Sequence, residues 1–155
     1  MNKFLKAIGI IVIITVLVCT FASCVKEPLP VNESDKIYII IIDGEETTVL
    51  ERNAEEGFLI DALEAFQNDG ELTFTTSGEG DSEYLLTIGT LSPNSANSEF
   101  IAVYTDVPNF YNEIWGTIEV VYDTETTVTF CSATNGIGSL PIQGECTYIF
   151  TIPSY

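Results

Sequence analysis

Two hydrophobic patterns open the folded part of the chain. Lys36-Ile-Tyr-Ile-Ile-Ile-Ile42 is apolar at successive positions rather than at every second one. A strand of this kind is covered on both faces, so we expect it in the middle of a sheet. Asp43-Gly44 predicts a tight turn, after which Thr47–Arg52 returns as the second strand of a hairpin.

A helical pattern follows, over about Ala54 to Gln67. Its apolar positions recur at helical spacing, at Leu59, Ile60, Leu63 and Phe66. Glu55 and Glu56 stand in the expected first turn, where negative charge favours the helix dipole, and Asn68-Asp-Gly70 should end the helix. We expect the apolar stripe of this helix to lie across the sheet.

The remainder of the chain alternates between strand and turn patterns. Segments rich in Thr, Ile, Val and aromatic residues predict strands at Leu72–Thr76, Glu83–Ile88, Glu99–Thr105, Thr117–Tyr122, Thr126–Cys131 and Cys146–Ile152. A hairpin, one helix and then a mixed sheet is the order of a β-grasp domain, in which a helical crossover lets the first strand pair in parallel with a later one. We therefore predict an α+β fold that is mainly β, a β-grasp-like mixed sheet with one packed helix, forming a single domain over residues 36–155.

The first hydrophobic segment has the organisation of an export signal. Lys3 and Lys6 provide a positive start, and Ala7 to Ala22 contains no charge. At 1.5 Å per residue this run spans roughly 24 Å, less than the ~30 Å hydrocarbon core that a permanent membrane helix must cross. We predict a cleaved lipoprotein signal peptide over residues 1–23, with an uncleaved anchor as the alternative.

Two cysteines compete as the lipidation site. Cys19 follows the branched Val18, a poor residue to cleave after, whereas Phe21-Ala-Ser-Cys24 resembles the bacterial lipobox. We therefore predict that Cys24 carries the lipid, that residues 24–35 form a tether, and that the domain lies on the extracytoplasmic face of the cell membrane. Each buried methylene contributes about 0.8 kcal/mol, so two or three acyl chains hold a protein firmly.

Charge narrows the range of partners. The chain has 5 Lys and Arg against 23 Asp and Glu, and all the acidic residues follow Ser23. This balance argues against nucleic acid as a partner, because phosphate binding requires Lys and Arg. The balance also argues against the protein body lying on an anionic bilayer.

The absence of histidine narrows the chemistry. It removes Ser-His-Asp and Cys-His catalysis and histidine-based zinc sites, and no arrangement of Ser, Thr and carboxylates identifies a nucleophile with its base. We expect neither an enzyme nor a metal site. Cys131 and Cys146 form an even pair in an exported domain, which predicts a disulfide, with two buried thiols as the alternative.

Four motifs occur in an order that resembles that of a known domain family. Phe58-Leu-Ile-Asp-Ala-Leu-Glu64, Glu83-Tyr-Leu-Leu-Thr-Ile-Gly89, Ser98-Glu-Phe-Ile-Ala-Val-Tyr104 and the closing Gly136-Ile-Gly-Ser-Leu-Pro-Ile-Gln-Gly144 with Tyr148-Ile-Phe150 follow one another along the chain. Together they resemble the transcobalamin-like C-terminal domain family, over about Lys36 to Tyr155. The resemblance implies a compact, mainly β domain on a bacterial surface lipoprotein. It also makes cobalamin or another corrinoid a candidate ligand, with no other cofactor expected.

One aromatic cluster is the candidate binding site. Phe110, Tyr111 and Trp115 fall in a predicted loop, Asp106 to Gly116, and Tyr104 ends the strand before it. Flat aromatics with polar tips suit a macrocycle, a sugar or a peptide. The alternative is that Trp115 packs beneath its own loop and closes the core.

Two turn segments carry weaker signals. Gly78-Glu-Gly-Asp-Ser-Glu83 does not follow the EF-hand order, so a solvated turn is favoured over calcium. Asn135-Gly-Ile-Gly138 lacks the third glycine of a dinucleotide fingerprint and predicts turn geometry only. The sequence thus indicates a lipid-anchored module that binds a small molecule or a cell-surface partner. The competing function is a structural or adhesive envelope module with no small-molecule ligand.

Overall fold

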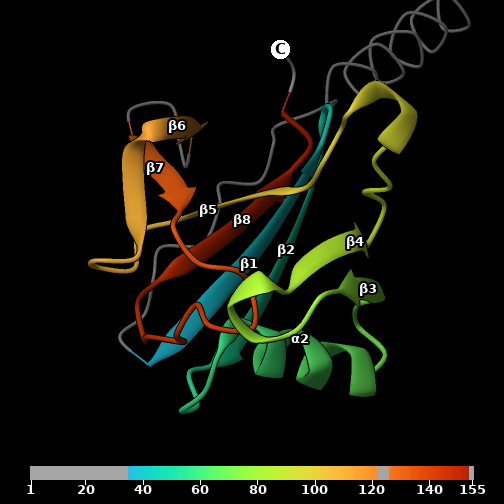
Figure 1. Cartoon of the computed structure of the whole chain (residues 1–155). Coiled ribbons are helices and arrows are strands. Elements are labelled where there is room, and N and C mark those ends of the chain that lie inside the picture. Colours follow the sequence, from blue (N-terminus) through green and yellow to red (C-terminus); the bar gives the residue numbers. More distant parts are fainter. Residues whose placement is uncertain (1–34, 122–125, 154–155) are drawn as a thin grey trace, which may run out of the picture.

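The computed structural model describes residues 35–121 and 126–153 (Figure 1). Its elements are β1 (Lys36–Asp43), β2 (Glu46–Asn53), α2 (Leu59–Asn68), β3 (Phe74–Ser77), β4 (Tyr84–Ile88), β5 (Ala102–Thr105), β6 (Tyr111–Val121), β7 (Thr127–Ala133) and β8 (Thr147–Thr151). Six strands form one mixed sheet in the order β2-β1-β8-β5-β7-β6, and β3 pairs with β4 separately. The predicted α+β class, mainly β with one helix, is confirmed among these residues.

Strand β1 lies inside the sheet, as its continuous hydrophobic pattern predicts. It pairs with β2 as an antiparallel hairpin and with β8 in parallel, so the expected parallel partner of the first strand is the last strand. Ile39 belongs to the core cluster that contains α2, and Ile40 belongs to a second cluster on the opposite face of the sheet. Both side chains are essentially inaccessible to solvent, which explains why neither face of β1 is polar.

The helix packs through the predicted stripe. Leu59, Leu63 and Phe66 are buried in the same cluster as the alternate isoleucines of β1, and Ile60 is partly buried against it. In Figure 1, α2 lies along one side of the molecule next to the β3–β4 pair. The helix and this small hairpin therefore cover the same face of the large sheet.

The helix begins later than its pattern predicts. Ala54 to Phe58 is not helical, and Phe58 instead makes a β-bridge with Pro141. Asp61 then takes the role expected of Glu55 and Glu56, because its carboxylate accepts the backbone N–H of Phe58 at 2.7 Å. A contact with a segment about eighty residues away thus decides where the first helical turn starts.

The predicted aromatic loop is wrong in its second half. Residues from Tyr111 onward belong to β6, which pairs with β7 up to Val121. The register shifts between Asn112 and Thr117, so the segment containing Trp115 is an irregular stretch within an edge strand. Ile114 and Trp115 on this stretch are exposed.

The predicted disulfide is not formed in this structure. Cys131 and Cys146 are both buried free thiols. Thr105 of β5 pairs with Cys131 on one side and with Tyr148 on the other, so β5 separates β7 from β8. Strands two places apart are about 9.5 Å from each other, which exceeds the ~7 Å limit between the Cα atoms of a disulfide.

The predicted signal peptide, the Cys24 lipid site and most of the tether lie outside the described residues. Within residues 35–121 and 126–153, no helix has the length and hydrophobicity needed to cross a membrane.

Candidate functional site

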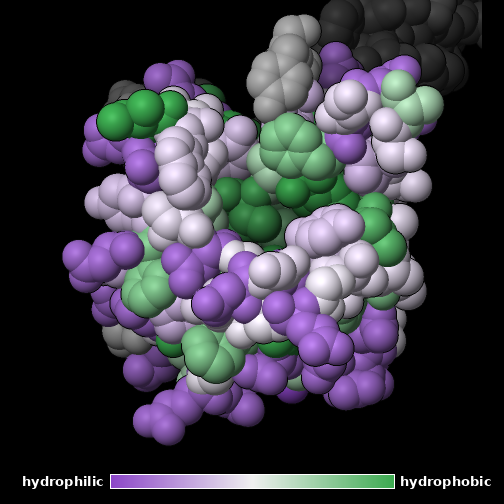
Figure 2. Space-filling model, in the orientation of Figure 1, coloured by the Kyte–Doolittle hydropathy of each residue, from purple (hydrophilic) through white to green (hydrophobic). Residues whose placement is uncertain are grey.

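An open hollow lies between β4, the segment leading into β5, and the end of β7. Its volume is about 320 Å³. Figure 2 shows hydrophobic surface at the bottom of this hollow, between the β6–β7 part of the molecule and β4. We refer to it below as the hollow.

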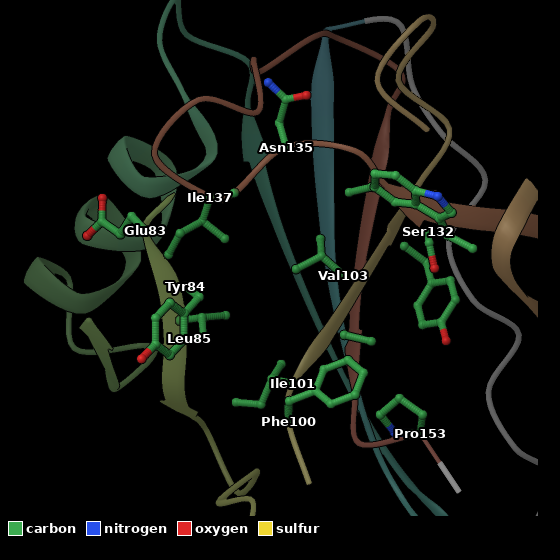
Figure 3. A pocket seen from close by; sticks show the side chains of 15 residues that line it. Glu83, Tyr84, Leu85, Phe100, Ile101, Val103, Ser132, Asn135, Ile137 and Pro153 are labelled. Carbon is green, nitrogen blue, oxygen red and sulfur yellow. The ribbon is translucent and has the colours of Figure 1, made fainter. Parts of the chain in front are cut away.

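The interior of the hollow is hydrocarbon. In Figure 3 the side chains of Leu85, Ile101, Val103 and Ile137 point toward a common centre. Leu85 and Ile137 are also members of the helix-side core, so the floor of the hollow is the outer layer of that core. A ligand entering the hollow would therefore contact side chains that the fold already holds in place.

The rim is aromatic and unusually exposed. Tyr84, Phe100 and Trp115 line the hollow, with 55%, 49% and 63% of their surfaces accessible to solvent. They come from β4, from the segment before β5 and from the irregular part of β6. Large apolar side chains that gather around one depression of a protein surface typically mark an interaction surface.

Two turns that lie far apart in the sequence, Gly78–Glu83 and Asn135–Gly138, contact each other and form one wall of the hollow. The N–H of Ile137 donates to the carbonyl oxygen of Glu83 at 3.1 Å. A Cβ at Gly136 would lie 2.6 Å from that same oxygen, and a Cβ at Gly138 would lie 2.6 Å from the carbonyl oxygen of Gly80. Glycine is required at both positions because the two backbones meet directly, and this contact places Ile137 beside β4.

The same segment caps the helix. Ile60 and Leu59 donate their N–H groups to the carbonyl oxygens of Ile137 and Leu140, at 3.1 and 2.8 Å. These bonds satisfy two of the N–H groups that a helix start leaves without an intrahelical partner. Residues 137–143, which we call the strap, therefore connect the helix start to the hollow.

Tyr148 holds the strap in place through its hydroxyl group. Its hydroxyl donates to the carbonyl oxygen of Pro141 at 2.7 Å and accepts the N–H of Gln143 at 3.1 Å. The residue is fully buried, and burial raises the pKa of its hydroxyl far above the ordinary value. The Tyr148 hydroxyl therefore stays neutral and serves as a hydrogen-bonding group, not as an acid or a base.

A buried polar cluster lies at the start of β8, apart from the residues that line the hollow. The Asp106 carboxylate accepts the N–H of Thr147 at 2.7 Å and a hydrogen bond from the Cys146 thiol. Burial raises the pKa of Asp106 above its usual range, although these bonds oppose the shift. Burial, with Asp106 nearby, raises the pKa of Cys146 to about 12, so this thiol stays protonated and unreactive near neutral pH.

The predicted binding residues separate into two groups. Tyr104 and Trp115 line the hollow, whereas Phe110 and Tyr111 do not. Phe110 packs partly buried against the helix-side core, and Tyr111 is exposed at the start of β6 without reaching the hollow. The aromatic cluster is thus divided, because Phe110 lies in the turn before β6 whereas Trp115 lies in the irregular part of β6.

Sequence reasoning missed Tyr84 and Phe100. A signal for Tyr84 was present, because Tyr84, Leu85 and Leu86 are apolar at successive positions of one strand. Such a strand is apolar on both faces although it has a partner on one side only. For Phe100 no comparable local signal exists. It precedes β5, and it lines the hollow only because β4 and the end of β7 are folded next to it.

The electrostatics of the described residues disfavour an anionic ligand. Their cationic side chains are Lys36 and Arg52, which bind Glu51 at 3.1 Å and Asp69 at 2.9 Å. Arg52 also lies over the ring of Phe66, 5.4 Å from its centre. Among the same residues, no group of three or more Cys, Asp or Glu side chains is placed to hold a metal ion. The hollow therefore suits a neutral or positively charged ligand with apolar surface.

No protein-family model matches this chain, and no curated protein matches it in sequence. The resemblance to the transcobalamin-like C-terminal domain family accordingly stays a prediction that depends on the motifs alone.

Proposed function

We propose that this protein is a membrane-anchored extracytoplasmic lipoprotein whose domain binds a ligand or partner in the hollow. The observation that carries the proposal is the set of exposed aromatics, Tyr84, Phe100 and Trp115, arranged around an apolar floor. Leaving three such side chains accessible to water is unfavourable unless a partner covers them. A binding module, not an enzyme, is the role that this arrangement favours.

We further propose a β-grasp domain of the transcobalamin-like C-terminal kind. Support comes from the order of the elements: a first hairpin, then the helix, and a last strand that pairs in parallel with the first. Additional support comes from the closing motif Gly136–Gly144, most of which forms the strap and the wall of the hollow.

A corrinoid is the small-molecule candidate that this family resemblance supplies. The hollow would cover only part of such a macrocycle, with Trp115 and Phe100 against its apolar surface. The test is equilibrium dialysis of the full-length chain in detergent against cobalamin. Fluorescence is followed in parallel, because Trp115 is the single tryptophan.

Two substitutions sharpen the corrinoid test. Trp115→Ala should weaken binding by about fivefold to tenfold, the usual effect of removing an aromatic contact at a binding site. Ile114→Ala is the matched control, because Ile114 is 92% exposed beside Trp115 and does not line the hollow. Equal affinity of both variants, or no retention of cobalamin at millimolar concentration, rejects the corrinoid assignment.

The adhesive alternative has its own support. Strand β6 is an edge strand and exposes Ile114, Trp115 and Val121. Purified envelope fragments that bind the full-length protein, and bind it less well after Ile114→Ala than after Tyr84→Ala, would favour adhesion through β6 over ligand binding in the hollow.

The anchor has a separate test. Mass spectrometry of the protein extracted from membranes should find residues 1–23 removed and acyl mass on Cys24. An N-terminus at Met1 would reject this part of the proposal without affecting the hollow.

A further inference from the structure

Strand β5 has an incomplete ladder on the side of β7. With β8 it pairs along its whole length, from Ala102 to Thr105. With β7 it pairs only through Tyr104 and Thr105. Beyond Ala133 the chain turns away toward the strap, so among the described strands none continues the ladder beside Ile101.

The hollow lies along this edge of β5. Ile101 and Val103 belong to the helix-side core, whereas Ala102 and Tyr104 belong to the cluster on the opposite face of the sheet. All four residues line the hollow. Since successive residues of a strand face opposite sides of a sheet, one depression can touch all four only at the edge of the strand.

We propose that the hollow receives an extended, positively charged segment of another protein, which adds as a strand beside Ile101. This inference rests on the proposed function of the hollow as a binding site and specifies its partner. In an extended strand, successive residues direct their N–H and C=O groups to alternate sides. The N–H of Tyr38 donates to Cys146 on the β1 side of β8, so Ile149 and Thr151 direct their groups at β5. Tyr104 and Ala102 pair with these two residues and direct their groups back at β8. Ile101 therefore offers both groups to the incoming segment, in the manner of other peptide-binding domains that accept a strand at a sheet edge.

The charge of the partner follows from the charge of the chain. The net charge is −18, and both described cations are already bound to carboxylates. Glu83 lines the hollow next to Tyr84, and Glu113 stands two residues before Trp115, whereas the Glu99 carboxylate is bound to Asn94 and Asn97. A lysine or arginine of the segment can lie over an aromatic ring at the rim while the acidic surface attracts it. An acidic segment would be repelled by the same groups.

The experiment uses the full-length protein in detergent and three synthetic peptides. The first is acetyl-Thr-Lys-Val-Lys-Val-Lys-Thr-amide. The second has the same sequence with alternate backbone nitrogens methylated, which keeps the charge and removes the N–H groups needed for a ladder. The third replaces each Lys with Glu. Binding is measured by Trp115 fluorescence and by the hydrogen exchange of the backbone amides of Ile101, Ala102 and Val103.

The first peptide should bind and slow the exchange of the Ile101 amide, whereas the amides of Ala102 and Val103, which already pair with β8 and β7, should change little. Methylation should weaken binding by at least about tenfold, the effect of losing one or two backbone hydrogen bonds at a site that excludes water. The Glu peptide should not bind. Tyr84→Ala and Trp115→Ala should weaken binding of the first peptide, and Ile114→Ala should leave it unchanged.

Other outcomes overturn the inference. Equal binding of the methylated peptide would mean that charge alone attracts the segment. Cobalamin binding without peptide binding would reject the strand addition and retain the proposed function. If neither the peptides nor cobalamin bind, and Tyr84→Ala has no effect in any assay, both the inference and the proposed function fail.

Discussion

Replacing Tyr148 with Phe tests how the strap is held. The substitution removes one hydroxyl and keeps the ring, which is fully buried in the helix-side core. The lost bonds are the one donated to Pro141 at 2.7 Å and the one accepted from Gln143 at 3.1 Å. Leaving a buried donor or acceptor unsatisfied costs about 1–3 kcal/mol, and the two affected groups belong to one short segment that can relax as a unit.

We therefore expect Tyr148→Phe to lower the free energy of unfolding by about 2 kcal/mol, which corresponds to a Tm lower by roughly 5–10 °C in a domain of this size. Denaturant unfolding followed by circular dichroism measures the change. Hydrogen exchange should localise it: the amides of Leu59 and Ile60, which donate to carbonyl groups of the strap, should exchange faster than those in the middle of α2.

The control is Tyr111→Phe, the same chemical change at a side chain that is 41% exposed. It should alter stability by less than about 0.5 kcal/mol. A Tyr148→Phe variant as stable as this control, with unchanged exchange at Leu59 and Ile60, would refute the view that the hydroxyl fixes the strap.

Three further predictions concern the packing around Gly136, the half-buried Asp106 and the thiols. Gly136→Ala places a Cβ against the carbonyl oxygens of Glu83 and Asp81 and should cost about 2–4 kcal/mol in unfolding free energy, from overpacking and the loss of the bond between Ile137 and Glu83. Gly70→Ala, where a Cβ meets nothing but φ is +77°, should cost only about 1 kcal/mol, and the reverse ranking would contradict the argument. Because burial raises the pKa of Asp106 in the folded state, that state binds the proton more readily than the unfolded chain does. The contribution of Asp106 to the free energy of unfolding should therefore be full below about pH 4 and be lost as pH rises through its raised pKa. Asp106→Asn should remove that part of the pH dependence, so a difference between wild type and variant that is constant from pH 3 to 7 would speak against it. Finally, Cys131 and Cys146 should resist iodoacetamide at pH 8 in the folded protein and react in denaturant without added reductant, whereas recovery of one peptide that joins them would show a disulfide after all.

The hydrophobic pattern by itself determined the main elements. The continuous run at residues 36–42 specified a strand covered on both faces, and the turn at Asp43-Gly44 specified its antiparallel partner. The spacing of Leu59, Leu63 and Phe66 specified the packed face of the helix. These features are local, because period and turn chemistry act within a few residues of one another.

Contacts between distant segments decided what the pattern could not. The helix begins at Leu59 because Phe58 bridges to Pro141, and nothing near Ala54 in the sequence reports that contact. The two cysteines looked like a pair because only their number and spacing were visible, whereas the insertion of β5 between β7 and β8 keeps them apart.

The candidate site shows the same division. Aromatic composition selected Tyr104 and Trp115, which line the hollow. It also selected Phe110 and Tyr111, which do not, and it overlooked Tyr84 and Phe100. Residue type indicates which side chains can bind, but the hollow forms where β4, β5 and β7 meet. Their meeting depends on strand order and on the glycine contact between residues 80–83 and 136–138. Sequence therefore determined the chemistry that this surface offers, and the tertiary structure decided which side chains share it, because proximity between distant segments is set by the packing of the whole domain.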